Sequence, residues 1–137
     1  MSEVAHDPLL ACAIAADHAR QIAVGTAIAV AFPRSPMHVA HQAHDLPALA
    51  DGRFVLGLGS QVQAHIEKRF SAIWRAPAAR LREYVLALRA IWHAWETGER
   101  LRFEGEHYRH TLMTPFFTPP AHGFAPLRSG SPPWGRG

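Results

Sequence analysis

The chain has 137 residues, of which 48% are hydrophobic, and this is enough apolar material for the core of one domain. The formal net charge is +3, but the basic residues are scattered among acidic ones, so the composition does not indicate nucleic-acid binding. The single Cys12 excludes an intrachain disulfide, and the most apolar stretch, residues 22–33, is too short to span a bilayer. We therefore expect a soluble, cytoplasmic protein in which Cys12 is a buried thiol.

The first predicted element is a helix that follows Asp7. Asp7 is the expected cap and Pro8 the first-turn proline, and apolar residues then recur at helical spacing, at Leu9, Ala13, Ala16 and Ala19. This helix precedes the first strand.

A strand, a helix and a second strand follow. Both strand sequences, IAVGTAIAVAF from Ile22 and RFVLGLGSQ from Arg53, are nearly continuous apolar runs, which is typical of parallel strands buried on both faces. Between them, Ser35 is the expected N-cap of a helix over residues 36–50, and Asp51-Gly52 ends it. We predict that residues 22–31 and 53–58 pair as adjacent parallel strands joined by this helix.

The middle of the chain is predicted to be rich in helix. Apolar residues keep helical spacing between Val62 and Trp74, and Pro77 begins a second helix that ends at Gly98. Its apolar side consists of Leu81, Tyr84, Val85, Leu88, Ile91, Trp92 and Trp95. The sequence LRFEGEHY, residues 101–108, predicts a weak hairpin. Residues 115–137 hold six of the eleven prolines and show no periodicity, so we expect a disordered Pro/Gly-rich tail.

Two stretches resemble a known family. VGTAIAVAFPRSP and, further on, DLPALADGRFVLGLGSQV are similar to the third and fourth strands of the luciferase-like monooxygenase superfamily, most of all to its coenzyme F420-dependent oxidoreductases. The likeness runs from about His6 to Pro119 and implies an α/β fold, a fragment of a (β/α)8 TIM barrel. A complete barrel needs at least about 200 residues, so the chain represents about half of one.

This resemblance defines the expected domains. We expect a partial luciferase-like barrel domain over residues 1–114 and the disordered tail over residues 115–137. Family members would enter a fifth strand shortly after the TPFFTPP stretch, residues 114–120, and a shifted reading frame or a truncated gene is one hypothesis for the difference.

The resemblance also implies a cofactor site at the carboxyl ends of the two strands, where barrel enzymes place their chemistry. The resemblance implies that Ala27 and Ile28 match a bulge, often built on a non-proline cis peptide, that lies behind the deazaflavin ring in the family. Thr26, which precedes them, is also expected to bind the cofactor. After the second strand come Gly59, Ser60 and Gln61. Small residues there let a planar ring approach the backbone, and the two polar side chains can donate hydrogen bonds.

Two departures from the family pattern leave the catalytic residues unassigned. Many F420-dependent relatives have a third glycine where this chain has Gln61, and an acidic proton donor where it has Val62. Arg34, at the head of the crossover helix, is a candidate partner for an anionic group of cofactor or substrate; a role as an exposed surface arginine is the alternative.

Other motifs are less informative. The Gly57-x-Gly59 pair lacks the third glycine of a dinucleotide fingerprint. Two clusters contain metal-ligand side chains, namely His38, His41 and His44 on the crossover helix, and Glu104, Glu106, His107 and His110 in the predicted hairpin. A small apolar ridge runs beside the three histidines and favours a packing role, so we predict no metal site.

The leading functional hypothesis is a fragment of an F420-dependent oxidoreductase whose intact form transfers hydride between F420 and a small organic substrate. One alternative is an FMN-dependent luciferase-like monooxygenase that uses O2, and another is a non-catalytic truncated half-barrel. The expected partners are a small-molecule substrate and a deazaflavin or flavin, with neither nucleic acid nor membrane. The chain alone is expected to be inactive, and its open strand edges favour a homo-oligomer.

Overall fold

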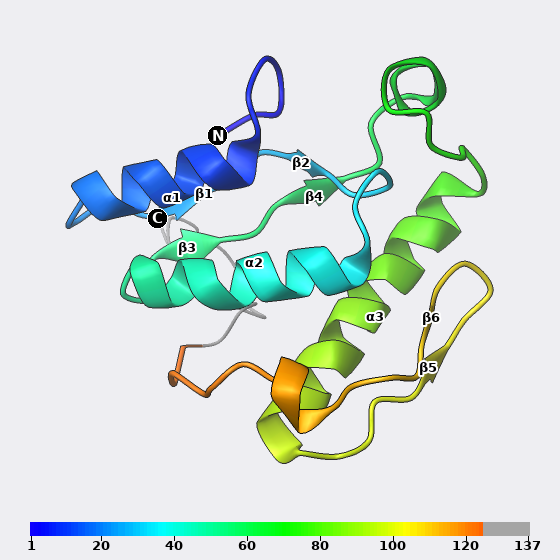
Figure 1. The fold of residues 1–137 in the computed structure, drawn as a ribbon. Helices are drawn as coiled ribbons and strands as arrows, with labels where there is room; N and C mark the ends of the chain where they lie inside the picture. The colour runs from blue at the N-terminus through cyan, green and yellow to red at the C-terminus, as the bar shows by residue number, and fades with distance from the viewer. Residues whose placement is uncertain (125–137) are drawn as a thin grey trace, which may run out of the picture.

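The computed structural model describes residues 1–124, which form an α/β fold (Figure 1). The helices are α1 (Pro8–His18), α2 (Pro36–Leu49) and α3 (Pro77–Thr97), with one π-helical turn at His65–Arg69 and one 3₁₀ turn at Pro115–Phe117. The strands are β1 (Val24–Gly25), β2 (Ala29–Val30), β3 (Phe54–Val55), β4 (Leu58–Gly59), β5 (Phe103–Glu104) and β6 (Arg109–His110).

The predicted parallel strand pairing is confirmed. β1 pairs in parallel with β3, and β2 with β4, so that Val24 lies opposite Phe54 and Val30 opposite Gly59. Each predicted strand is divided into two short pieces, because the chain leaves the regular ladder between β1 and β2. The helix α2 connects the two halves of this βαβ unit, as expected.

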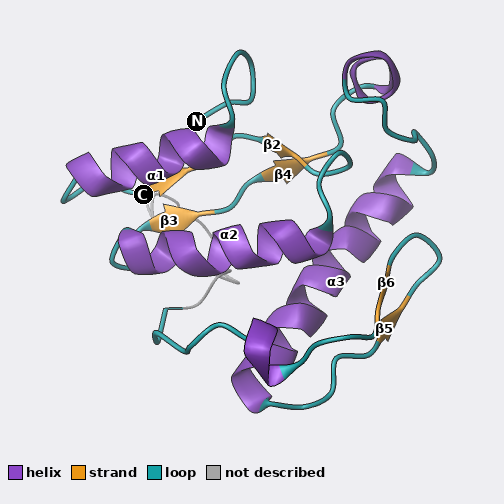
Figure 2. Ribbon diagram, in the orientation of Figure 1, coloured by secondary structure: helices purple, strands orange, loops and turns teal. Residues whose placement is uncertain are grey.

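Helices α1 and α2 lie side by side and pack on the strands (Figure 2). Both predicted N-caps are confirmed. The Asp7 carboxylate accepts hydrogen bonds from the backbone N–H groups of Leu9 and Leu10, each at 2.9 Å, and the Ser35 hydroxyl accepts one from Met37 at 3.2 Å. Cys12 is fully buried in the core between these elements, as predicted.

The long helix α3 crosses α2 and completes the core (Figure 1). Tyr84, Leu88 and Ile91 are fully buried, and the Trp92 indole N–H donates to the carbonyl oxygen of Ala40 at 3.1 Å. Trp95, also predicted to be buried, is half-buried instead. Gly98 ends the helix with a left-handed φ of 73°, as its position predicted.

The predicted helix between Val62 and Trp74 is much shorter than expected. Regular π-helical hydrogen bonding covers only His65–Arg69, and Ser71 takes a φ of 53°, which no helix can continue through. Of the apolar residues that suggested the helix, Ile66 is buried, whereas Ile73 is 74% exposed. The helical spacing therefore did not correspond to one continuous buried face.

The predicted hairpin is confirmed as the antiparallel pair β5 and β6, in which Phe103 lies opposite His110. Its turn is attached to α3, because the Glu83 carboxylate accepts hydrogen bonds from the backbone N–H groups of residues 106, 107 and 108 at 3.2, 2.8 and 2.7 Å.

The first part of the predicted tail contacts α2. His122 Nε2 donates to the carbonyl oxygen of His44 at 2.6 Å, and His44 Nε2 donates to that of Pro120 at 3.0 Å. Residues 125–137, the remainder of the predicted tail, lie outside the described residues. Within residues 1–124, no helix is long and apolar enough to cross a bilayer.

Candidate cofactor site

Thr26 holds the two strands together where the ladder is interrupted. Its hydroxyl donates to the carbonyl oxygen of Gly57 at 2.7 Å and accepts from the Gly57 N–H at 2.8 Å. The side chain is buried, with 5% exposure. Because the single hydroxyl hydrogen is used by Gly57, Thr26 positions the bulge rather than offering a donor to a ligand.

The bulge itself contains a cis peptide bond between Ala27 and Ile28, which agrees with the feature implied by the family resemblance. The backbone groups of Ala27 are occupied by the first two residues. Its N–H donates to the carbonyl oxygen of Met1 at 2.6 Å, and its carbonyl oxygen accepts from the Ser2 hydroxyl at 2.7 Å. The side chains of Ala27 and Ile28 are exposed, so the bulge presents an apolar surface.

This apolar surface continues across the neighbouring strand. Successive side chains of β3 point to opposite faces, so Val55 is exposed whereas Phe54 is buried on the helix side. A Cβ on Gly59 would collide with the Ile28 side chain. The structure therefore brings the bulge and the second strand end together, as the predicted site requires, on the side opposite to α2.

The residues after β4 are shaped by Gln61. Its φ of 62° lies in the left-handed region that favours glycine, and it stands where the family resemblance implies a third glycine. Its side-chain oxygen accepts from the Val62 N–H at 3.1 Å, and its carbonyl oxygen accepts from the Ser60 hydroxyl at 3.3 Å. Among the described residues the Gln61 side-chain amide nitrogen has no partner, whereas the Thr26 and Ser60 hydroxyls both donate within the protein, so Gln61 offers the free side-chain donor of the six predicted cofactor residues.

Arg34 is held by two carboxylates. Its guanidinium donates to Glu3 at 2.8 Å and to Asp7 at 2.7 Å, and also to the carbonyl oxygen of Val30 at 2.8 Å. Burial lowers the pKa of Arg34, but the two carboxylates outweigh it and raise the pKa overall. Burial likewise raises the pKa of Asp7, while its hydrogen bonds and Arg34 bring it below the usual range. An anionic ligand at Arg34 would have to compete with both acids.

The sequence did not reveal a cluster at the end of β2. The Arg80 guanidinium lies 4.4 Å from the centroid of the Phe32 ring and donates to the Tyr108 hydroxyl at 2.9 Å. Tyr84 is fully buried, its hydroxyl has no partner among the described residues, and burial raises its pKa. Arg80 and Tyr84 are four residues apart on α3, a spacing that places them on one face, but their contact with Tyr108 required the folded structure.

Two of the three α2 histidines pack against an aromatic side chain, whereas His38 is exposed. The rings of His41 and His44 lie 4.6 and 5.6 Å from the Trp95 ring, centroid to centroid, and burial lowers the pKa of His41. In the hairpin, Glu104 interacts with Arg102 and Arg109, and Glu106 with Arg75. Within residues 1–124, no three His, Cys, Asp or Glu side chains are grouped so as to hold a metal ion.

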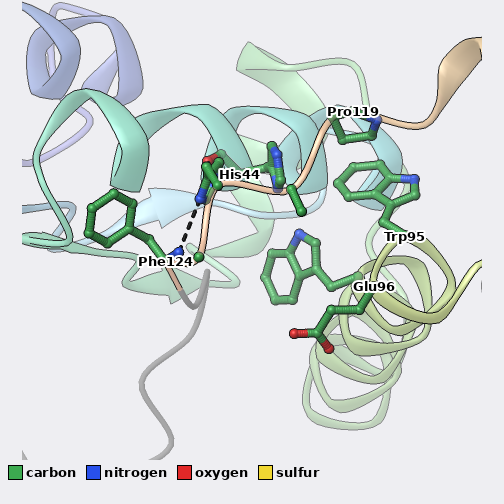
Figure 3. A pocket seen from close by; sticks show the side chains of 9 residues that line it. His44, Trp95, Glu96, Pro119 and Phe124 are labelled. Atoms are coloured by element: carbon green, nitrogen blue, oxygen red, sulfur yellow. Dashed lines mark hydrogen bonds between the residues drawn. The ribbon is translucent and has the colours of Figure 1, made fainter.

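Two cavities of the described structure contain no predicted cofactor residue. One, of about 340 Å³, lies between α1 and α2. The other, of about 250 Å³, lies between α2, α3 and residues 119–124 (Figure 3). At the proposed cofactor surface, the side chains of Ala27 and Ile28 are exposed.

The sequence is similar to those of several known proteins. Residues 1–134 match the model of a family described as luciferase-like monooxygenase. Uncharacterized proteins of Mycobacterium tuberculosis and Mycobacterium bovis are 55% identical over 118 residues, which are 86% of this chain and 35% of each relative. An F420-dependent glucose-6-phosphate dehydrogenase of Intrasporangium calvum is 34% identical over 104 residues, covering 71% of this chain and 30% of the relative. The chain thus spans about a third of the length of these relatives.

Solved structures show the same fold. The monooxygenase RslO1 from Streptomyces bottropensis aligns with a TM-score of 0.72 at 23% identity, over 88% of this chain and 35% of that one. The coenzyme F420-dependent tetrahydromethanopterin reductase from Methanopyrus kandleri aligns with a TM-score of 0.59 at 17% identity, over 77% of this chain and 33% of that one. The described residues thus have the fold of part of a TIM barrel, as the sequence predicted.

Proposed function

The chain belongs to the luciferase-like monooxygenase family, and on this premise we propose that it is part of an F420-dependent oxidoreductase whose intact form transfers hydride between F420 and a small organic substrate. The support for F420 is the 34% identity to an F420-dependent relative over 71% of this chain. Because the chain spans only 35% of the length of its more similar relatives, we propose the activity for the intact form and not for these residues alone.

The observation that carries this proposal is the contact of Ile28 with Gly59, which joins the bulge to the second strand end. The surface around it has small or apolar side chains, and a planar ring can approach such a surface closely. Ala27, Ile28 and Gly59 would hold one face of the ring, and the free amide of Gln61 would donate to a polar ring edge. Once bound, the deazaflavin supplies the hydride-transfer chemistry itself.

The described residues would supply only part of the site. Arg34 is already paired with Glu3 and Asp7, so it is not a free cation for a phosphate. Val62 replaces the acid expected from the family and cannot move a proton. The role of this chain in the intact enzyme is therefore to bind and orient the ring, while the phosphate contacts and the proton donor come from elsewhere.

The test is a titration of the purified 137-residue chain with F420, FMN and riboflavin, followed by fluorescence, with light scattering to report its oligomeric state. We expect weak binding of F420. We also expect FMN and riboflavin to bind with equal affinity, because the proposed surface offers no free cation to the FMN phosphate. Micromolar binding of F420 by a monomer, with reduction of an acceptor, would show that the chain carries a complete site.

A matched pair of variants locates the ring. Ile28→Ala removes the side chain that lies against Gly59 and should weaken F420 binding several-fold. Leu112→Ala, at a position that is 76% exposed and lies beyond the hairpin, should leave the affinity unchanged. Equal effects of the two substitutions would contradict the placement of the ring at the bulge.

The FMN-dependent monooxygenase is the second candidate, and the description of the matching family favours it. In the same titration it predicts tighter binding of FMN and riboflavin than of F420. The third candidate, a non-catalytic half-barrel, predicts no binding of any of the three by a folded chain.

A further inference from the structure

A second potential ligand site lies far from the cofactor surface, between α2, α3 and residues 119–124. The cavity there has a volume of about 250 Å³. Figure 3 shows His44, Trp95, Glu96, Pro119 and Phe124 around it. An apolar cavity of about 150 Å³ can already hold a benzene-sized molecule, so the space is sufficient for a small organic group.

The aromatic walls of the cavity offer π-faces rather than hydrogen-bond donors. The Trp92 indole N–H is used by the carbonyl oxygen of Ala40 at 3.1 Å, and that of Trp95 by the Met113 sulfur at 3.3 Å. The Phe124 ring adds a third aromatic side chain. A ligand in this cavity therefore meets aromatic surfaces whose polar N–H groups are already paired.

The two histidines that line the cavity are also engaged. Their Nε2 atoms bond to carbonyl oxygens, which can only accept, so both Nε2 atoms carry a hydrogen. His122 Nδ1 accepts from the backbone N–H of Phe124 at 3.2 Å, so both ring nitrogens of His122 have partners. These bonds hold residues 120–124 against α2 and so form one wall of the cavity.

The charge of the lining is negative. Glu96, exposed at the cavity, is the only acidic residue among the described residues that line it, and no lysine or arginine lines it. Glu96 has no ion pair within residues 1–124, whereas the nearby Glu99 interacts with His93. An unpaired carboxylate beside aromatic rings attracts cations and repels anions.

We propose that this cavity binds a small organic cation that carries a quaternary, trimethylated ammonium group. Such a group is weakly hydrated, interacts favourably with aromatic faces and cannot donate hydrogen bonds, so it matches aromatic walls whose indole N–H groups are already paired. Glu96 supplies the opposite charge. The proposal is independent of the cofactor surface and of the F420 assignment.

The test compares choline with 3,3-dimethyl-1-butanol, its uncharged isostere, by calorimetric titration of the 137-residue chain. We expect choline to bind at least about fivefold more tightly than the alcohol. Glu96→Gln should abolish this preference. Glu99→Gln, which removes the same charge three residues away on a side chain outside the cavity, should keep it.

A spectroscopic readout establishes where the probe binds. In ¹H–¹⁵N spectra, choline should shift the indole signals of Trp92 and Trp95, and Trp95→Leu should reduce its affinity while the circular dichroism of the chain stays unchanged. Any one of three results would overturn the proposal. These are equal affinity for choline and the alcohol, a preference for choline that survives Glu96→Gln, and no binding of choline at all.

Discussion

Glu83 illustrates how a single side chain attaches one element to another. Its carboxylate accepts hydrogen bonds from three consecutive backbone N–H groups of the hairpin turn. Burial raises the pKa of this carboxyl, but the hydrogen bonds from Tyr108 and His107 outweigh burial and bring the pKa below its usual range. The ionised form is therefore favoured in the folded protein.

This shift predicts a pH-dependent contribution to stability. A carboxyl whose pKa is lower in the folded state stabilises the fold fully above its unfolded pKa of about 4.3, and the contribution is lost as the pH falls through the folded pKa. Glu83→Gln should therefore lower the free energy of unfolding by about 1 kcal/mol at pH 7 and by less at pH 3. Urea denaturation at the two pH values measures this.

The matched control is Glu106→Gln in the same hairpin. Glu106 is exposed and pairs with Arg75 at 3.2 Å on the surface, so its substitution should change stability by less than about 0.5 kcal/mol. If the two substitutions lower the free energy of unfolding equally, the backbone hydrogen bonds to Glu83 stabilise the fold no more than the surface ion pair of Glu106 does.

At the scale of elements, the start of α1 combines a helix cap with an ion pair. One oxygen of Asp7 caps the helix, and the other accepts from Arg34, which is 16% exposed. The sequence predicted the cap, because a cap needs only local spacing. It did not predict the ion pair, because Arg34 comes 27 residues later in the chain.

Two substitutions separate these roles. Asp7→Ser keeps a capping oxygen and loses the ion pair, whereas Asp7→Ala loses both. We expect Asp7→Ala to destabilise the chain more than Asp7→Ser, by about 1 kcal/mol, the usual contribution of an N-cap. Thermal unfolding of both variants checks this, and identical melting temperatures would contradict the capping role.

The docking of α3 is tested by a pair of leucines. Leu88 is fully buried against the rest of the core, so Leu88→Ala should cost about 2 to 5 kcal/mol. Leu86 lies on the same helix but is 36% exposed, so Leu86→Ala should cost less than about 1 kcal/mol. Chemical denaturation compares them, and an unchanged midpoint for Leu88→Ala would mean that α3 does not pack as described.

At the scale of the whole molecule, the strand face opposite to α2 is uncovered within the described residues. Val55 and Ile28 are 42% and 36% exposed on this face, and each described parallel strand pairs with one neighbouring strand. Exposed apolar side chains together with unpaired strand edges favour association.

We therefore expect the purified chain to form concentration-dependent oligomers. Val55→Lys should shift the distribution toward monomer, because it places a charge on the uncovered face. Leu112→Lys, which adds the same charge at a residue with 76% exposure, should not. Light scattering across a concentration series measures both, and a monomeric parent chain would contradict the prediction.

The sequence alone determined the features that depend on local order. These features are each determined within a few residues, and all were predicted correctly. They include helix caps such as Ser35, the end of α3 at Gly98 and the apolar runs of the parallel strands. The resemblance to the family, carried by the two strand sequences, was also readable, and so was the cis peptide at Ala27–Ile28 that it implied.

Tertiary structure decided the rest. Three features depended on contacts between residues far apart in the chain. These are the pairing of Arg34, which decides whether it is free for an anion, the extent of helix in residues 62–74, and the side chains that contact Trp95. Periodicity shows that a residue has an apolar side but not which surface will cover it. For this reason the strand pattern predicted where the proposed cofactor residues lie. Only the tertiary structure, which brings together the strands, the bulge and the first residues of the chain, decided which of their hydrogen-bonding groups are free and which are occupied.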